Sequence, residues 1–350
     1  MLLSEFDFPF DQALVADHPV MPRHDARLLV MDRSSHARMH RRVADLPLLL
    51  HPGDLIVVNN TKVMPARVPG RTRSTGKQLD LLFVQDLGQG LWEVLIKGRF
   101  KPGSLIDFPG GGCGEIVERS QSRTTMKVAG VTSVYDLMHA TGTMPLPPYI
   151  KREPSPDDQH WYQTMFAQQE GAIAAPTAGL HFTPELVETL TAKGIEMAEV
   201  TLHVGPGTFR SVKSDRIEEH RMLAEQVEVT TRTVEQIRQA HQRGNRVVAV
   251  GTTVVRALET AGHAGRGIQP FQGPADLFIT PGFEFQVIDA LVTNFHLPRT
   301  TLLMLVSAFV GLEPLRAAYE EAVVERYRFY SYGDAMLIAG GSAHRYISSL

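Results

Sequence analysis

Three histidines lie beside glycine, threonine or proline, just after apolar segments of the chain. They are His181 in Thr177-Ala178-Gly179-Leu180-His181, His203 in Leu202-His203-Val204-Gly205-Pro206-Gly207, and His296 in Asn294-Phe295-His296-Leu297-Pro298. An imidazole exchanges protons near neutral pH, and glycine lets the backbone approach a ligand closely. The pattern favours one pocket with His181, His203 and His296 as candidate acid–base catalysts, although site histidines often only orient another group.

Small, hydroxyl-bearing and amide residues accompany these histidines, with one arginine. An arginine can pair with a carboxylate or phosphate through two parallel hydrogen bonds, so the expected ligand is anionic. The candidate binding residues of these segments are Thr177, Gly179, Gly205, Gly207, Thr208, Arg210 and Asn294.

A further turn, Gly251-Thr252-Thr253, follows the apolar run 247–250 and precedes a helical pattern. The free N–H groups at a helix N-terminus favour anions, so these three residues are also candidate ligand contacts. The alternative is that Gly251 only makes the turn and the threonines only cap the helix. The segment lacks the GxGxxG pattern, so it does not indicate a dinucleotide site.

Glu218, Glu219, His220 and Glu225 form an acidic and imidazole group that could supply a base or metal ligands. No HExxH or cysteine-based pattern accompanies it, so we expect no metal site. A solvated helix face explains the adjacent glutamates equally well.

Basic residues gather near aromatic ones in three places. Cations interleaved with aromatic rings are typical of contacts to single-stranded or looped RNA, although such rings often serve packing instead. The candidate RNA-binding residues are Lys97, Arg99, Lys101, Lys151, Arg152, Arg326 and Arg328.

The elements that position these residues change character along the chain. Helical and strand patterns alternate in residues 1–62 and again in 150–350, whereas 63–149 contains short β runs separated by glycine and proline. We expect strands at 66–73, 79–85, 91–96, 104–108, 113–118 and 124–128 in that middle segment. After it, the pattern predicts a helix over 157–168 and, further along, a strand over 276–279. The sequence therefore predicts an α/β protein: a discontinuous, mixed-sheet α/β catalytic domain (1–62 and 150–350) with an inserted small all-β, barrel-like domain (63–149).

Whole-chain properties are those of a globular protein. The 350 residues carry a formal net charge of -3, with 43% hydrophobic and 21% charged residues. The single cysteine, Cys113, excludes an internal disulfide and favours a reducing compartment, so a cytoplasmic location is expected. The apolar run 301–312 is too short for a membrane span, which needs ~20 residues. We expect no membrane partner and favour a monomer.

Several motifs together resemble the S-adenosylmethionine:tRNA ribosyltransferase-isomerase family of queuosine biosynthesis. They are spread over nearly the whole chain and are specific as a set. Besides the histidine and Gly251 segments, they are Asn59-Asn60-Thr61-Lys62-Val63, Pro145-Leu146-Pro147-Pro148-Tyr149-Ile150, Ile279-Thr280-Pro281-Gly282 and Tyr330-Ser331-Tyr332-Gly333-Asp334-Ala335-Met336. Two positions depart from the family pattern: Ser211 stands where proline is usual, and Leu223 where a second histidine is expected.

The resemblance implies transfer of the ribosyl part of S-adenosylmethionine (AdoMet) to 7-aminomethyl-7-deazaguanine at the wobble position of tRNA. The ribosyl unit rearranges to give epoxyqueuosine, and adenine and methionine leave; AdoMet is a consumed substrate and no cofactor is expected. Under this interpretation the three histidines supply acid–base catalysis. Thr177, Thr208 and Arg210 hold the ribose or the methionine carboxylate, and the Gly251 turn takes an anion.

Two other classes of function remain open from the residues alone. A non-catalytic RNA-binding protein would not require three histidines at strand ends. An AdoMet-dependent RNA methyltransferase would carry an acidic ribose-binding residue after a Gly-rich motif, and the sequence offers no clear candidate.

Overall fold

The computed structural model describes the chain except residues 121–122, 206–211, 213, 264–266 and 341–350. Within the described residues, the larger part of the chain forms a nine-stranded mixed sheet. Its strands are, in spatial order, β15 (Phe271–Ala275), β13 (Glu225–Val229), β12 (Glu196–Leu202), β3 (Leu55–Asn59), β14 (Val247–Val250), β16 (Ala290–Asn294), β17 (Ala335–Ala339), β1 (Arg27–Asp32) and β2 (Arg38–Arg42).

Four central strands, β12, β3, β14 and β16, run parallel to one another. Their carboxyl ends therefore meet at one edge of the sheet, where α/β proteins usually bind ligands. Strand β17 is antiparallel to β16, so the loop that leads into β17 reaches the same edge. This arrangement places His203, which follows β12, and His296, which follows β16, at the same edge although they are far apart in the sequence.

Helices cover both faces of the sheet because successive strand side chains point to opposite sides. Leu55 and Val57 of β3 belong to one core cluster, and Ile56 and Val58 belong to the other. The first cluster includes residues of α5 (Thr231–Gln242), α6 (Thr252–His263), α7 (Thr301–Val310) and α8 (Leu312–Val324); the second includes residues of α1 (Leu46–Leu49) and α4 (Pro184–Ala192).

Helices α7 and α8 are, within the described residues, the one bent pair whose combined length and apolar composition would suit a broken membrane span. The two helices are bent by 114° at Gly311, and eight of the ten residues of α7 are buried inside the protein. No single helix among the described residues is long and apolar enough to cross a membrane.

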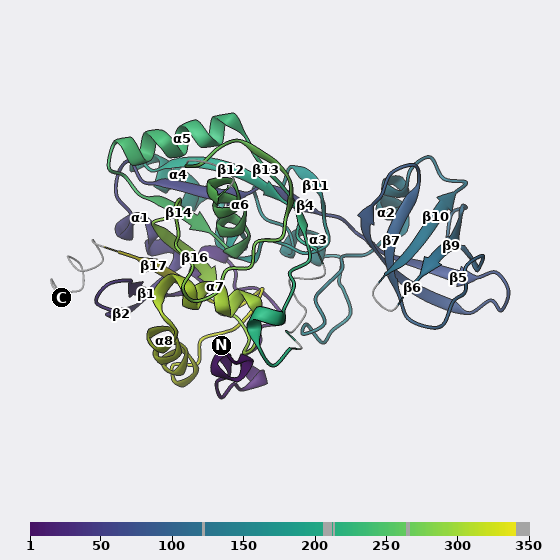
Figure 1. Cartoon of the computed structure of the whole chain (residues 1–350), viewed down its shortest axis with the longest axis horizontal. Helices are drawn as coiled ribbons and strands as arrows, with labels where there is room; N and C mark the ends of the chain where they lie inside the picture. Colours follow the sequence, from purple (N-terminus) through teal and green to yellow (C-terminus); the bar gives the residue numbers. More distant parts are fainter. Residues whose placement is uncertain (121–122, 206–211, 213, 264–266, 341–350) are drawn as a thin grey trace.

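The inserted segment forms a closed six-stranded barrel, which projects from one end of the sheet domain (Figure 1). Every one of its strands lies within one residue of the predicted bounds at both ends. In spatial order they are β10 (Thr124–Ala129), β7 (Leu91–Ile96), β6 (Gln78–Asp86), β5 (Arg67–Thr72), β8 (Leu105–Asp107) and β9 (Cys113–Arg119). The predicted fold class is confirmed, whereas the domain boundaries at 63 and 149 stay a prediction.

The junction between the two parts consists of a small parallel pair, β4 (Thr61–Val63) and β11 (Gln169–Ala172). Helix α2 (Val134–Thr141) packs against the barrel strand β5. Ile173, which follows β11, joins the barrel core. The remaining short 3-10 helices are η1 (Leu3–Phe6), η2 (Gln12–Leu14), η3 (Arg23–Asp25), η4 (Val43–Asp45), η5 (Thr177–His181) and η7 (Ile217–Glu219).

Two local expectations were wrong. The helix expected over 157–168 is only the single turn α3 (Asp158–Trp161), because the Asp158 carboxylate is used by Arg152 and by the Ser155 backbone, which fixes a turn there. The strand expected at 276–279 is replaced by β15, one segment earlier, because residues 271–275 pair with the edge of β13. Local sequence patterns indicate neither the Asp158 contacts nor the pairing of β15 with β13, so they could not predict these two segments correctly.

Candidate active site

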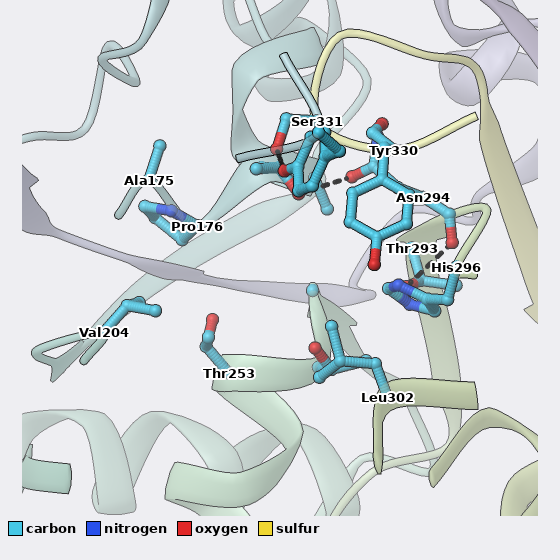
Figure 2. A pocket seen from close by; sticks show the side chains of 15 residues that line it. Ala175, Pro176, Val204, Thr253, Thr293, Asn294, His296, Leu302, Tyr330 and Ser331 are labelled. Atoms are coloured by element: carbon cyan, nitrogen blue, oxygen red, sulfur yellow. Dashed lines mark hydrogen bonds between the residues drawn. The ribbon is translucent and has the colours of Figure 1, made fainter. Parts of the chain in front are cut away.

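A small pocket lies at the carboxyl ends of the central strands. Figure 2 shows Ala175, Pro176 and Val204 on one side of it, facing Tyr330, Asn294 and His296 on the other. Its lining residues are Tyr149, Ala175, Pro176, Thr177, Ala178, Val204, Gly251, Thr252, Thr253, Thr293, Asn294, His296, Leu302, Tyr330 and Ser331. The cavity measures about 30 Å³, far less than the roughly 300 Å³ or more of most ligand pockets, so it must widen to admit a nucleoside.

Hydroxyl groups dominate the polar lining, and none of the described lining residues is a lysine, arginine, aspartate or glutamate. Thr252 and Thr253 stand in the first turn of α6, after Gly251 with its φ of +93°. The Thr253 Oγ1 is buried and has no hydrogen-bond partner among the described residues. A buried hydroxyl without a partner costs stability, so this group is available for a ligand.

Asn294, the last residue of β16, connects three segments around the pocket. Its Oδ1 accepts a hydrogen bond from the Thr177 Oγ1 at 3.0 Å. Its Nδ2 lies 3.1 Å from the His181 Nε2 and 3.1 Å from the Tyr330 carbonyl oxygen. The amide therefore ties η5 and the loop before β17 to the end of β16.

His296 lines the pocket and is buried. Its Nε2 is 2.9 Å from the Thr293 Oγ1, and its backbone N–H donates to the Tyr319 hydroxyl at 2.9 Å. Burial disfavours the charged ring and lowers the pKa of His296 to about 3. The imidazole is therefore neutral at pH 7.

His181 stands one hydrogen bond behind the pocket, on the far side of Asn294. It lines a separate small cavity together with Arg23 and Tyr332. Burial lowers the pKa of His181 to about 3, and the nearby cations of Arg23 and Arg328 act in the same direction. His181 is thus a neutral ring that does not line the small pocket.

His203 follows β12 and is only half-buried. Its Nδ1 lies 2.8 Å from the Thr61 Oγ1. Burial lowers the pKa of His203 from its ordinary value, while Glu228 opposes the shift. A Cβ on Gly171, whose φ is +152°, would lie 2.7 Å from the His203 ring, so glycine is required beside this imidazole.

A cleft of about 500 Å³ contains His203 in its wall and is closed on the other side by the barrel. Asp86, Glu93 and Tyr135 come from the inserted segment, and Glu170 comes from β11. The remaining described lining residues are Met64, Val84, Gln85, Trp92, Gly171, Val204, Gly205, Leu223, Ala224, Glu225 and Gln226. Val204 lines both cavities, so the small pocket and the cleft are neighbours.

The carboxylates of the cleft differ in their partners. Glu170 pairs with Lys62 at 2.9 Å and with His139 at 3.2 Å, and Glu93 pairs with Arg123 at 3.4 Å. None of the described lining residues is a lysine or arginine. Glu225 pairs with the buried Arg256, so three of the four lining carboxylates have cationic partners behind the wall. Asp86 forms no ion pair within the described residues, and the cleft therefore suits a cationic or neutral group better than a phosphate.

The structure brings six of the thirteen predicted catalytic and ligand-binding residues together in one pocket. These six are Thr177, Gly251, Thr252, Thr253, Asn294 and His296. His203 and Gly205 line the cleft, whereas Gly179 is buried against Thr164, whose methyl group lies 3.1 Å from a Cβ placed on it. Gly207, Thr208 and Arg210 lie outside the described residues, as does Ser211.

The predicted RNA-binding residues divide into two groups. Lys97, Arg99, Lys101, Lys151 and Arg326 are exposed. Arg152 instead pairs with the buried Asp158 at 2.6 Å and 2.7 Å. Arg328 donates to the carbonyl oxygens of His18 and Tyr332.

The aromatic rings beside Arg328 favour the packing alternative. Phe329 is fully buried and Tyr332 is 2% exposed, so neither ring offers a face to RNA.

The site residues that were not predicted include Thr61, Tyr149 and Tyr330. Each belongs to a motif that supports the family resemblance, but nothing local in those motifs indicates a role in a pocket. Leu223, one of the two departures from the family pattern, is half-exposed in the cleft. In the described part of the chain, no three His, Cys, Asp or Glu side chains are grouped so that they could hold a metal ion.

The fold and the site define an α/β protein with a two-part ligand site, one part of which is closed by an inserted barrel. A family model described as "queuosine biosynthesis protein" matches residues 3–338. The chain belongs to this queuosine biosynthesis family.

Several relatives are similar along almost their whole length. The S-adenosylmethionine:tRNA ribosyltransferase-isomerase of Aquifex aeolicus is 47% identical over 340 residues, which cover 97% of this chain and 100% of that protein. The protein of the same name from Heliobacterium modesticaldum is 47% identical over 343 residues, with 97% and 100% covered. The crystal structure of an S-adenosylmethionine tRNA ribosyltransferase from Thermotoga maritima is 37% identical, with a TM-score of 0.56, and covers 96% of this chain and 100% of that one.

Proposed function

We propose that the chain acts as an S-adenosylmethionine:tRNA ribosyltransferase-isomerase. It transfers the ribosyl part of AdoMet to 7-aminomethyl-7-deazaguanine in tRNA and isomerises it, which gives epoxyqueuosine and releases adenine and methionine. Membership of the queuosine biosynthesis family and the 47% identity to the Aquifex aeolicus enzyme support this activity. The observation that supports the location of the chemistry is that Val204 lines both the uncharged pocket and the neighbouring cleft, whose wall contains carboxylates.

The small pocket takes the nucleoside part of AdoMet. Its described lining is uncharged and rich in hydroxyl groups, which suits adenine and ribose. The N-terminus of α6, with the unpartnered Thr253 hydroxyl, binds an anionic group of the ligand, such as the methionine carboxylate. Arg210 and Thr208 stay proposed contacts to the ribose or carboxylate.

The cleft takes the nucleobase that receives the ribosyl group. A primary aminomethyl group is protonated near pH 7, and the cleft wall offers carboxylates without a lysine or arginine among its described residues. A nucleobase carried by tRNA reaches the cleft from the barrel side, where Lys97, Arg99 and Lys101 are exposed. Those cations contact RNA phosphates.

His203 is the proposed base that removes the proton next to the sulfonium. It stands beside Val204, where the two cavities adjoin. The Thr61 hydroxyl donates to the Gln169 carbonyl oxygen and lies 2.8 Å from the His203 Nδ1. In the tautomer with the proton on Nδ1, that hydroxyl accepts the Nδ1–H, and the lone pair of Nε2 is free for a substrate proton. Its ring is neutral above its lowered pKa, as a base must be.

His181 and His296 serve as neutral imidazoles that orient neighbouring groups. Their pKa values of about 3 make both rings weak proton acceptors at pH 7. A neutral imidazole still donates a hydrogen bond, which assists departure of adenine. A monomeric, cytoplasmic enzyme remains the proposed physiological form.

Product analysis tests this function. The chain is incubated with AdoMet and tRNA that carries 7-aminomethyl-7-deazaguanine, and the small molecules released are separated. Free adenine is expected only when both substrates are present. Formation of S-adenosylhomocysteine would instead indicate methyl transfer, and absence of any product would indicate binding alone.

A further inference from the structure

Tyr330 has a backbone conformation that is unusual for an aromatic residue. Its φ is +71°, in the left-handed region that bulky side chains rarely adopt. The ring lines the small pocket, and its centroid lies 3.9 Å from that of Tyr149 at an interplanar angle of 59°. Strained residues persist only where surrounding contacts hold them, and they concentrate at functional sites.

Backbone contacts on both sides hold this loop in place. The Tyr330 N–H donates to the Phe295 carbonyl oxygen at 3.1 Å, and the Gly333 N–H donates to the Tyr330 carbonyl oxygen at 3.0 Å. A Cβ on Gly333 would lie only 2.4 Å from the Arg328 carbonyl oxygen. The loop has therefore little freedom to relax.

Asn294 supplies the side-chain contact to the same carbonyl. Its Nδ2 hydrogens are directed to the Tyr330 carbonyl oxygen and to the His181 Nε2, and its Oδ1 accepts from Thr177. Both N–H groups of the amide are used inside the protein. Asn294, predicted as a substrate contact, thus has the geometry of a residue that positions its neighbours.

The hydroxyl of Tyr330 is the free end of this arrangement. No hydrogen bond joins it to another described residue. The whole residue is only 9% exposed and lines the small pocket. Burial raises the pKa of Tyr330, so its hydroxyl is protonated near pH 7. A protonated phenol in an uncharged pocket is a hydrogen-bond donor for a ligand.

We propose that Tyr330 binds the nucleoside of AdoMet by donating a hydrogen bond from its hydroxyl, and that Asn294 is a positioning residue that acts through Tyr330. The inference rests on the proposed function, because it takes AdoMet as the occupant of the pocket. It adds Tyr330 as a ligand contact that the sequence patterns did not predict, and it changes the role of Asn294 from a predicted substrate contact to a positioning residue.

The first experiment measures binding of labelled AdoMet by equilibrium dialysis, without tRNA, and then adenine release with tRNA. Tyr330→Phe keeps the ring and removes the hydroxyl, and we expect about tenfold weaker AdoMet binding. The KM for tRNA stays unchanged. Tyr327→Phe is the matched control, because it also removes a tyrosine hydroxyl from this loop. The Tyr327 hydroxyl contacts His40, and the buried Tyr327 does not line the pocket.

The second experiment asks whether Asn294 acts through Tyr330. Asn294→Ala weakens AdoMet binding at least as much as Tyr330→Phe, and the double variant binds no more weakly than Asn294→Ala alone. Such non-additivity is expected when one residue works through the other. Losses that simply multiply would overturn the positioning role.

A stability measurement keeps the proposal testable if Asn294→Ala folds poorly. At a left-handed position glycine is tolerated and alanine is strained, so Tyr330→Gly unfolds at a higher temperature than Tyr330→Ala. The reverse order would contradict the strain argument. AdoMet affinity equal to that of the parent in Tyr330→Phe would refute the ligand contact.

The binding assay separates this inference from the proposed function. If the parent binds AdoMet but releases no adenine, the proposed function is wrong, and the dialysis data still decide the role of Tyr330.

Discussion

At the scale of single residues, the three histidines have different environments. His181 and His296 are buried neutral rings with pKa values of about 3, whereas His203 is half-buried at the cleft. The sequence patterns predicted the three as equivalent candidates, because residue type and spacing say nothing of burial. Desolvation, which depends on the complete fold, separates them.

The role of His203 as base gives a first prediction. Replacement by glutamine keeps a polar side chain of similar size but removes the base, and a positioned general base contributes at least about 100-fold to the rate. We expect kcat of His203→Gln to fall by about this factor, measured as adenine release. In the parent, kcat/KM also falls as the pH decreases through the lowered pKa of His203, because the base becomes protonated.

His241→Gln serves as the control, since His241 lies on α5 and pairs with Asp289, away from both cavities. A His203→Gln enzyme with a parental rate, or one that retained the acid limb of the pH profile, would exclude His203 as the base.

The two buried histidines make a prediction for stability. In the unfolded chain their pKa is about 6.5, so between pH 6.5 and 3 the unfolded state binds protons that the folded state does not. Stability is therefore complete above pH 6.5 and declines as the pH falls. At about pH 5.5 each histidine lowers the free energy of unfolding by ~1.4 kcal/mol relative to its value above pH 6.5. In His296→Gln, the loss of unfolding free energy on acidification is smaller by that amount.

Urea unfolding at about pH 7 and about pH 5.5 measures both free energies of unfolding. An identical pH dependence in the parent and in His296→Gln would mean that His296 is not a buried neutral group.

At the scale of elements, strand ends and helix starts form the site. Gly251 and Thr253 follow β14, Asn294 ends β16 and His203 follows β12, which the apolar strand patterns predicted. The loop before β17 was not predicted to belong to the pocket, because its contribution depends on antiparallel pairing of β17 with β16. Short-range patterns do not report such long-range pairing.

The first turn of α6 yields a prediction in which binding and stability change in opposite directions. Thr253→Val removes a buried hydroxyl that has no partner among the described residues. The free energy of unfolding is expected to rise by about 1 kcal/mol, while AdoMet binds more weakly because the ligand loses a contact.

Thr301→Val is the matched control. The Thr301 Oγ1 is also buried without a partner among the described residues, yet Thr301 does not line the pocket. It should stabilise the chain by a similar amount and leave AdoMet affinity unchanged. If Thr253→Val bound AdoMet as tightly as the parent, the α6 N-terminus would not be part of the AdoMet site.

At the scale of the whole molecule, the inserted barrel contributes one wall of the cleft. Its six strands were predicted closely because each short β run is bounded by glycine or proline. The cleft itself was not predicted, since it arises where Asp86 and Tyr135 of the inserted segment face Glu170 and His203 of the sheet domain.

The exposed cations of the barrel give a prediction for tRNA. Replacing Lys97, Arg99 and Lys101 together with alanine should raise the KM for tRNA and leave the KM for AdoMet unchanged. Each lost phosphate contact lowers the slope of log affinity against log salt by roughly 0.7–0.9. Titrations of tRNA at several salt concentrations measure this slope.

Lys77→Ala tests specificity, because Lys77 is also an exposed cation of the inserted segment but lies in a different hairpin. Equal effects of Lys77→Ala and of a single Lys97→Ala substitution would argue against a defined RNA surface around Lys97.

The central claim is that AdoMet gives its ribosyl group to tRNA, and a double-label experiment tests it most directly. AdoMet carries carbon-14 in the methyl group and tritium in the ribose, at carbons other than the one next to the sulfonium, whose proton the base removes. It is incubated with the chain and aminomethylated tRNA, and both labels are counted in the recovered tRNA. We predict that tritium enters the tRNA, while carbon-14 remains in free methionine. Carbon-14 in the tRNA without tritium would contradict the account.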